Sequence, residues 1–155
     1  MPTYTVSSFA GTLNDDQKQA LASAITRAHH EATGAQTFFA QVVFHTIPRG
    51  DWFVGGQRVD GQQLFINGQV RAGRPKDVKL GLLKELARVA CRCTDFDSNK
   101  VWVYLNELPP SNMVEYGYVL PEPGAEHQWL ETLSAKDREL MMSLKPAGAE
   151  PKPAH

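Results

Sequence analysis

The chain has 155 residues, of which 42% are apolar and 21% charged, and its formal net charge at pH 7 is −1. This length and composition are typical of one soluble globular domain with a hydrophobic core of its own. A net charge this close to zero argues against a nucleic-acid-binding surface, which normally requires a strongly basic chain. The sequence contains no apolar run of 18 residues and does not begin with a basic segment followed by an apolar one. We therefore expect neither a membrane span nor a secretory signal.

The two cysteines, Cys91 and Cys93, are separated by one residue within a helical pattern. At that spacing their side chains point in different directions, which suits neither a disulfide nor a zinc site. Reduced cysteines are typical of the cytoplasm, which is the location we predict.

The first third of the chain predicts a strand, a helix and a second strand. Residues 2–9 form a strand-like run that begins at the amino terminus itself, and residues 40–47 form another run that ends before Pro48. Gly34 is a typical residue just after the end of a helix. The predicted helix carries one apolar stripe at helical spacing, formed by Leu21, Ile25, Ala28 and Ala32.

The same order returns later in the chain. Residues 48–62 are rich in glycine and turn formers, which predicts a loop or an irregular hairpin rather than a domain linker. Residues 64–70 then predict a strand, and a helix is expected from Pro75, as its first helical residue, to about Cys93. Residues 101–108 predict the last strand of this set.

Residues 2–47 and 64–108 are therefore interpreted as two βαβ units. Right-handed crossovers make the two strands of each unit parallel, and the fused units then form a four-stranded mixed sheet with both helices on one face. This predicts an α+β fold whose other sheet face lacks cover, so we expect oligomerisation. A short C-terminal helix is expected over residues 128–144. We assign residues 1–145 to one domain and residues 146–155 to a disordered Pro/Ala-rich tail.

The amino terminus is the first candidate for chemistry. If Met1 is removed, Pro2 carries a free secondary amine at the start of the first strand. An α-amino group titrates at about 7.7–8.0, close enough to neutrality for it to serve as base, acid or nucleophile. Many chains begin with Met-Pro and have no such chemistry, so this signal needs support from other residues.

Two arginines and a histidine are candidates for binding an anion. Arg71 and Arg74 flank a predicted strand-to-helix turn, where their guanidinium groups and the helix N-terminus can converge on a carboxylate. The alternative is two solvated arginines. At about 100° per residue, His29 falls on the edge of the buried helix stripe and His30 faces solvent. His29 is thus the site candidate, although a histidine at a core margin is more often structural.

Tyr104 and Glu115 are the remaining candidates. Tyr104 shares a sheet face with Trp102 by the period-two rule, so it either supplies a hydroxyl to a pocket or packs on the sheet. Glu115 follows a Pro-Pro break in a short apolar segment, where a carboxylate acts either as a base on water or in a salt bridge at a rim. Spacing alone does not indicate that these groups meet. The sequence shows no recognisable serine or cysteine triad, phosphate-binding loop or metal-ligand cluster.

Taken together, these stretches resemble the tautomerase superfamily and, more closely, the cis-3-chloroacrylic acid dehalogenase family, in which two βαβ units are fused in one chain. The resemblance spans residues 2 to about 145, with the motifs in order. It rests on Pro2-Thr3-Tyr4, AITRAHHEATG (24–34), FAQVVF (39–44), VRAGR (70–74), VWVY (101–104), NMVEYG (112–117), LPEPG (120–124) and Trp129.

The resemblance implies a role for six residues: Pro2 as the catalytic proline, His29, Arg71 and Arg74 as ligands of the substrate carboxylate, and Tyr104 and Glu115 as the pair that positions and activates water. It also implies a homotrimer and a small carboxylate substrate, with no cofactor and no metal. The implied reaction is hydration of a carbon–carbon double bond conjugated to a carboxylate, as in the conversion of cis-3-haloacrylate to malonate semialdehyde. Pro2 would be the acid and Glu115 the base.

Two other functions compete with this hydratase or dehalogenase. A keto–enol tautomerase would use Pro2 as a general base on a 2-hydroxydienoate or phenylenolpyruvate. Glu115 with Tyr104 favours hydration, because a simple tautomerase does not activate water. A non-enzymatic trimeric binding protein with a vestigial pocket is the second alternative, and the complete residue set argues against it.

Overall fold

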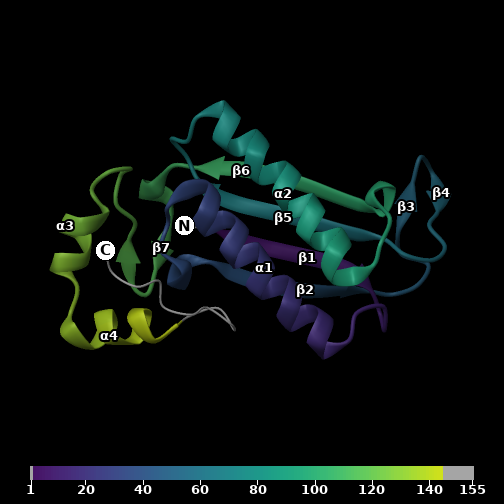
Figure 1. Ribbon diagram of the computed structural model, residues 1–155, viewed down its shortest axis with the longest axis horizontal. Helices are drawn as coiled ribbons and strands as arrows, with labels where there is room; N and C mark the ends of the chain where they lie inside the picture. The colour runs from purple at the N-terminus through teal and green to yellow at the C-terminus, as the bar shows by residue number, and fades with distance from the viewer. Residues whose placement is uncertain (1, 145–155) are drawn as a thin grey trace.

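The computed structural model describes residues 2–144. In this range one sheet carries two long helices, and a smaller C-terminal part lies beyond one end of the sheet (Figure 1). Met1 and the predicted disordered tail, residues 146–155, lie outside the described residues.

The order of elements follows the predicted repeat of strand, helix and strand. The strands are β1 (Thr3–Phe9), β2 (Gln41–Ile47), β3 (Phe53–Val54), β4 (Gln57–Arg58), β5 (Leu64–Arg71), β6 (Val101–Leu108), β7 (Val114–Glu115) and β8 (Tyr118–Val119). The α-helices are α1 (Asp15–Thr33), α2 (Lys76–Thr94), α3 (Glu126–Thr132) and α4 (Ala135–Ser143), and the short 3-10 helices are η1 (Thr37–Phe39), η2 (Ser98–Lys100) and η3 (Pro110–Asn112).

The main sheet has the strand order β2-β1-β5-β6. β1 pairs with β2 in parallel and β5 pairs with β6 in parallel, as expected for two right-handed βαβ units. The two units meet through the antiparallel pair β1–β5, in which Tyr4 lies opposite Gly68. The predicted α+β fold with a four-stranded mixed sheet is confirmed.

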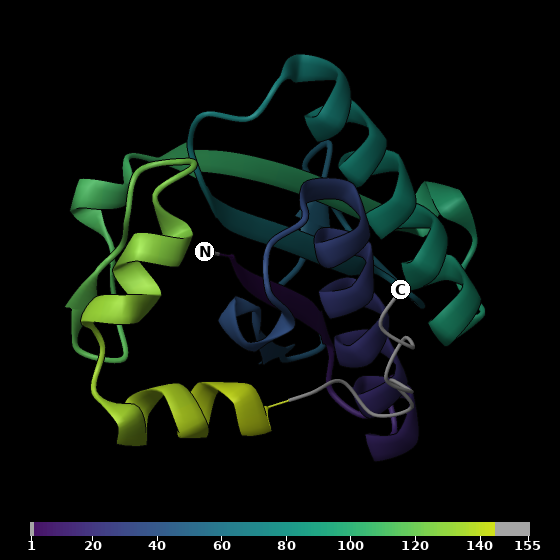
Figure 2. The same cartoon turned by 60° about the vertical axis from the view of Figure 1, so that its left-hand side comes forward.

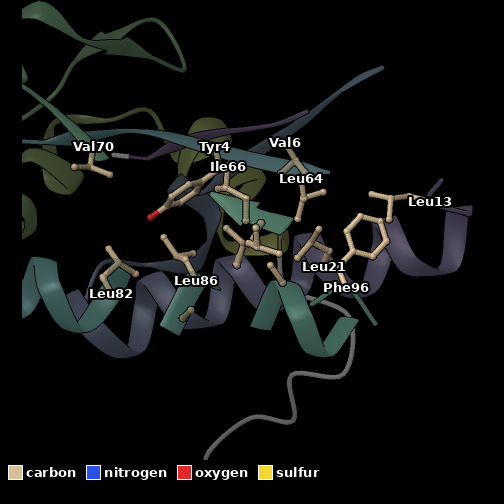
Figure 3. Packing of buried hydrophobic residues seen from close by; sticks show 14 residues of the cluster. Tyr4, Val6, Leu13, Leu21, Leu64, Ile66, Val70, Leu82, Leu86 and Phe96 are labelled. Atoms are coloured by element: carbon tan, nitrogen blue, oxygen red, sulfur yellow. The ribbon is translucent and has the colours of Figure 1, made fainter. Parts of the chain in front are cut away.

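Both long helices cover the same face of this sheet (Figure 1). Alternate residues of β1 and β5 are buried under them, and each helix contributes one apolar stripe, as the periods of strand and helix require. The main core, shown in Figure 3, includes Tyr4, Val6, Leu21, Leu64, Ile66, Val70, Leu82 and Leu86.

Local capping explains where the two long helices begin and end. α1 starts after Asn14, whose side chain accepts a hydrogen bond from the backbone N–H of Gln17 at 2.8 Å, and it ends before Gly34, as predicted. α2 begins at Lys76, with Pro75 as its N-cap residue. The prediction that Pro75 is the first helical residue is thus wrong by one position, because this proline has the extended ψ of 151°.

The opposite face of the sheet carries exposed aromatic side chains. Trp102 and Tyr104 share this face, as predicted, and are 43% and 54% exposed. The β3–β4 hairpin forms within residues 48–62, where a loop or irregular hairpin was expected, and it lies at the end of the sheet remote from the C-terminal part (Figure 1).

Residues 109–144, here called the C-terminal arm, lie beyond the end of the sheet at which β1 begins (Figures 1 and 2). The arm contains two helices rather than the single helix predicted over residues 128–144. The helix breaks because Ser134 caps a new one, its hydroxyl accepting from the N–H of Asp137 at 3.1 Å. The arm packs on η1 through a second core of Phe38, Phe39, Leu120, Leu133 and Met141.

Candidate active site

Pro2 lies at the end of the sheet that faces the C-terminal arm. It is buried, and its carbonyl oxygen accepts a hydrogen bond from the backbone N–H of Gln41 at 3.0 Å. The start of β1 is therefore held against β2, and the candidate proline has a defined position.

Tyr4 of β1, two residues after Pro2, and His29 of α1 form a buried polar pair. The hydroxyl oxygen of Tyr4 lies 2.7 Å from Nδ1 of His29, and the exposed fractions of the two residues are 0% and 2%. Burial, together with the positive charge of Arg74, lowers the pKa of His29 to about 3. Burial also raises the pKa of Tyr4. Both side chains are therefore neutral near pH 7, and His29 occupies the buried margin of α1 as predicted.

Arg71 fastens the C-terminal arm to β5. It is 3% exposed, its Nη1 donates to the carbonyl oxygen of Pro121 at 2.8 Å, and its Nη2 donates to the carboxylate of Glu126. The second oxygen of Glu126 accepts from the N–H of Gly124 at 2.8 Å. Burial acts to raise the pKa of Glu126, but the hydrogen bonds from Arg71 and the backbone together hold that pKa below its ordinary value. Glu126 is thus ionised and tied to Arg71.

Arg74 lies in the turn between β5 and α2, and the backbone of this turn is tightly held. Gly73 has φ 103°, and a Cβ there would lie 2.9 Å from Cγ of Pro123 in the arm, so the turn requires glycine. The Glu107 carboxylate accepts a hydrogen bond from Nζ of Lys79 at 2.5 Å, and this contact, together with the nearby backbone of Gly73 and Arg74, holds the pKa of Glu107 below its ordinary value. Burial and the neighbouring charge of Arg71 both lower the pKa of Arg74, so the two guanidinium groups repel one another.

Three buried side-chain atoms in residues 2–144 have no hydrogen-bond partner: His29 Nε2, Arg71 Nε and Arg74 Nε. A buried polar group without a partner costs about 1–3 kcal/mol. The two arginine atoms are donors, and Nε2 is a donor when Tyr4 donates to Nδ1. The three residues also interact electrostatically with one another. The arrangement therefore suits an anion with several acceptor oxygens, such as a carboxylate.

Glu115 lies in β7 and lines a hollow of about 860 Å³ whose walls come from the arm, α1, η1 and the main sheet. Thr3, next to Pro2, and Gln41 line the same hollow. Tyr116 holds this segment in place because its hydroxyl donates to the carbonyl of Phe38 at 2.6 Å. Pro2 and the three carboxylate-binding candidates are not among the described residues that line this hollow. One chain therefore does not place Glu115 and the three carboxylate-binding candidates around the same hollow.

Tyr104 lies elsewhere. It packs edge-on against Phe65 at 5.1 Å and lines a separate hollow of about 330 Å³ on the uncovered face. Leu108, which does line the hollow of Glu115, is four residues along β6, or roughly 13 Å. A single chain thus does not bring Tyr104 and Glu115 together.

Sequence reasoning missed Tyr4 and Glu126, which contact the candidate residues directly. The alternation of β1 places Tyr4 on the buried face, but no sequence rule pairs its hydroxyl with a histidine 25 residues away. Glu126 lies 55 residues from Arg71. Its position at the start of α3, two residues after Gly124, gave no indication of this contact.

Within residues 2–144, no helix is both long and apolar enough to cross a membrane. The same residues contain no group of three or more His, Cys, Asp or Glu side chains arranged to hold a metal ion.

The chain matches one protein family and resembles several solved structures. The Tautomerase_3 family, described as "Putative oxalocrotonate tautomerase enzyme", matches residues 1–133. The solved structure of N1, described as a member of the cis-3-chloroacrylic acid dehalogenase (cis-CaaD) family, is 33% identical with a TM-score of 0.89, and the match covers 92% of this chain and 99% of that chain.

Two further solved structures are similar. Native Ps01740 is 34% identical with a TM-score of 0.69, and the match covers 73% of this chain and 99% of that one. A wild-type symmetric trimer of fused 4-OT, Q0, shares the fold at 24% identity, with a TM-score of 0.69 over 76% of this chain and 94% of that one. None of the curated proteins matches the sequence.

Proposed function

Because the chain belongs to the Tautomerase_3 family of the tautomerase superfamily, we propose that it is a cofactor-independent hydratase or dehalogenase of small three-carbon unsaturated acids. The proposed substrate has a double bond conjugated to a carboxylate, as in cis-3-chloroacrylate, and the product in that case is malonate semialdehyde.

The observation that carries this proposal is the set of buried side-chain nitrogens of His29, Arg71 and Arg74 that have no hydrogen-bond partner within residues 2–144. A substrate carboxylate would accept from them, and charge-assisted hydrogen bonds of this kind are worth about 1.5–3 kcal/mol each. Bound in this way, the carboxylate draws electron density from the β-carbon and so favours attack of a nucleophile there.

The remaining groups supply the water and the proton. Glu115 takes a proton from a water molecule, whose oxygen attacks the β-carbon. Pro2, as a secondary ammonium after removal of Met1, donates a proton to the α-carbon. The chlorohydrin that results loses chloride and the hydroxyl proton, which leaves the aldehyde of malonate semialdehyde. Acid and base are thus two groups with separate positions.

We also propose that the enzyme is a cytoplasmic homotrimer in which Tyr104 assists Glu115 from a neighbouring copy of the chain. In one chain Tyr104 and Trp102 are exposed on the uncovered sheet face. The fused 4-OT structures that share this fold are described as trimers. The two cysteines are free, which fits the reducing cytoplasm.

A keto–enol tautomerase is the second candidate. Two observations favour it: the matching family is described by oxalocrotonate tautomerase activity, and Tyr104 is remote from Glu115 within one chain. This reaction needs Pro2 as a general base and the carboxylate-binding groups, with no activated water. The substrate would be a 2-hydroxydienoate or phenylenolpyruvate.

The first experiment is a proton NMR time course of the purified protein with cis-3-chloroacrylate, after mass spectrometry has established that Met1 is absent. Pro2→Ala is the matched control, because it keeps a terminal amine and removes the proline ring. Malonate semialdehyde, or its decarboxylation product, formed by the wild type and greatly reduced in Pro2→Ala would support hydration. Unreacted acid together with rapid ketonisation of phenylenolpyruvate would replace hydration by the tautomerase.

A further inference from the structure

We infer that Tyr4 is a positioning residue that holds His29 in the tautomer with its hydrogen on Nε2, so that His29 acts as a neutral hydrogen-bond donor to the substrate carboxylate. This inference rests on the proposed function, in which His29 binds that carboxylate, and it adds a residue and a protonation state that the proposed reaction does not specify.

The first argument is the donor count at the buried pair. The Tyr4 hydroxyl and His29 Nδ1 are 2.7 Å apart, so one of them donates to the other. If Nδ1 donated, the phenolic hydrogen of the fully buried Tyr4 would need another acceptor, and no other partner of this hydroxyl is found in residues 2–144. Leaving this buried donor without an acceptor would cost about 1–3 kcal/mol. If Tyr4 donates, its hydrogen is satisfied and the ring hydrogen lies on Nε2.

The second argument is the charge around the ring. Burial is the largest factor that disfavours a proton on His29, Arg74 is the next, and Arg71 and His30 act in the same direction. Tyr4 itself stays neutral because burial raises its pKa. His29 therefore adds no third positive charge to two arginines that already repel one another. His29 therefore contributes one directed, uncharged N–H donor to the binding of an anion.

The third argument is the packing that fixes Tyr4. Its ring lies against Gly68, the residue opposite it in the β1–β5 pair. A Cβ at position 68 would lie 2.6 Å from Cε1 of Tyr4 and 2.7 Å from Cδ2 of Leu105. Such contacts are too short for real side chains. The Tyr4 ring and the Leu105 side chain therefore occupy the space that a side chain at position 68 would need. In Figure 3 the Tyr4 ring lies in the main core, among Val70, Leu82 and Leu86. Close packing prevents the hydroxyl from moving away from Nδ1.

The test is ¹⁵N NMR of the histidine rings in the full-length protein without ligand, with the His29 signals assigned by their loss in His29→Gln. In the wild type we expect one protonated nitrogen, Nε2, and one unprotonated nitrogen, Nδ1, throughout pH 5–8. Tyr4→Phe should populate the other tautomer. Tyr118→Phe is the control, because it removes another tyrosine hydrogen bond, to Asp137 in the arm. A hydrogen on Nδ1 of the wild type, or an unchanged tautomer in Tyr4→Phe, would overturn the inference.

A second readout follows carboxylate binding without catalysis. Propionate should shift the Nε2 signal of the wild type, and its dissociation constant should rise about tenfold in Tyr4→Phe, which corresponds to the loss of one hydrogen bond. Gly68→Ala, which displaces the Tyr4 ring while keeping its hydroxyl, should shift the tautomer in the same direction. Propionate binding that is equal in wild type and Tyr4→Phe would contradict the role of Tyr4. Absence of turnover with every unsaturated acid would overturn the proposed function and leave the tautomer result standing.

Discussion

Arg71 at the end of β5 and Glu126 at the start of α3 form an ion pair that joins the main sheet to the C-terminal arm. The side chain of Arg71 is 3% exposed and that of Glu126 is 39% exposed, so the contact lies at the boundary between core and solvent. The residue expected to bind substrate is thus also the residue that fastens the arm carrying Glu115. We infer that arm position and carboxylate binding are coupled through Arg71.

Glu126→Gln should weaken this attachment. The amide cannot form the ion pair, and because solvent screens the partly exposed Glu126 carboxylate, the free energy of unfolding should fall by about 1 kcal/mol, measured by urea denaturation. The KM for an unsaturated acid should change as well, because Arg71 loses the partner that orients it. Glu122→Gln, the same chemical change at an exposed position of the arm, is the control. If the two variants unfold alike, the ion pair does not hold the arm.

The buried His29 should make stability depend on pH. Its pKa is about 3 in the folded protein and about 6.5 in an unfolded chain, so between these values only the unfolded state binds the proton. Its stabilising contribution is complete above pH 6.5 and is lost as pH falls toward 3, by up to about 1.4 kcal/mol per pH unit.

Urea denaturation at several values between pH 4.5 and 7.5 measures this slope. His29→Gln should flatten the slope relative to the wild type. His30→Gln, on the exposed side of α1, should keep it. Equal slopes in all three proteins would show that His29 is not buried in its neutral form.

Glu115→Gln should separate the two candidate reactions. The amide is close in shape to the carboxylate but cannot accept a proton from water, so hydration of cis-3-chloroacrylate should be lost. Ketonisation of phenylenolpyruvate should be retained, because it does not use water. Glu131→Gln, on the exposed side of α3, is the control for both assays. A parallel fall of both activities would assign Glu115 a structural role.

Arg74→Ala should damage both reactions, since both substrates present a carboxylate. Loss of one charge-assisted hydrogen bond of about 1.5–3 kcal/mol raises KM roughly 10–100-fold. Arg88→Ala, which removes an exposed guanidinium of α2 paired with Glu85, should leave the steady-state kinetics unchanged. Wild-type kinetics in Arg74→Ala would remove this residue from the site.

Trp102→Asp should disrupt the proposed trimer, because a carboxylate on the uncovered sheet face loses hydration when the face is buried. Sedimentation velocity would then detect monomers. Leu80→Asp, at a comparably exposed apolar position on α2 (49% against 43%), should remain trimeric. A trimer that persists in Trp102→Asp would place the interface elsewhere.

Local geometry made much of the fold predictable from the sequence alone. The period of two along β6 puts Trp102 and Tyr104 on one shared face, and the helical period separates buried His29 from exposed His30. These assignments hold because the direction of a side chain relative to its own strand or helix depends on backbone dihedral angles, which neighbouring residues determine. The helical period singled out His29, whereas the roles of all six candidate residues came from the family resemblance.

Only the tertiary structure decided which groups meet. Tyr4 reaches His29, and Arg71 reaches Glu126, across 25 and 55 residues of chain. The same packing places Tyr104 and Glu115 against different hollows. These partners depend on how the two βαβ units and the C-terminal arm close-pack around shared cores, a long-range outcome that no periodicity along the sequence encodes.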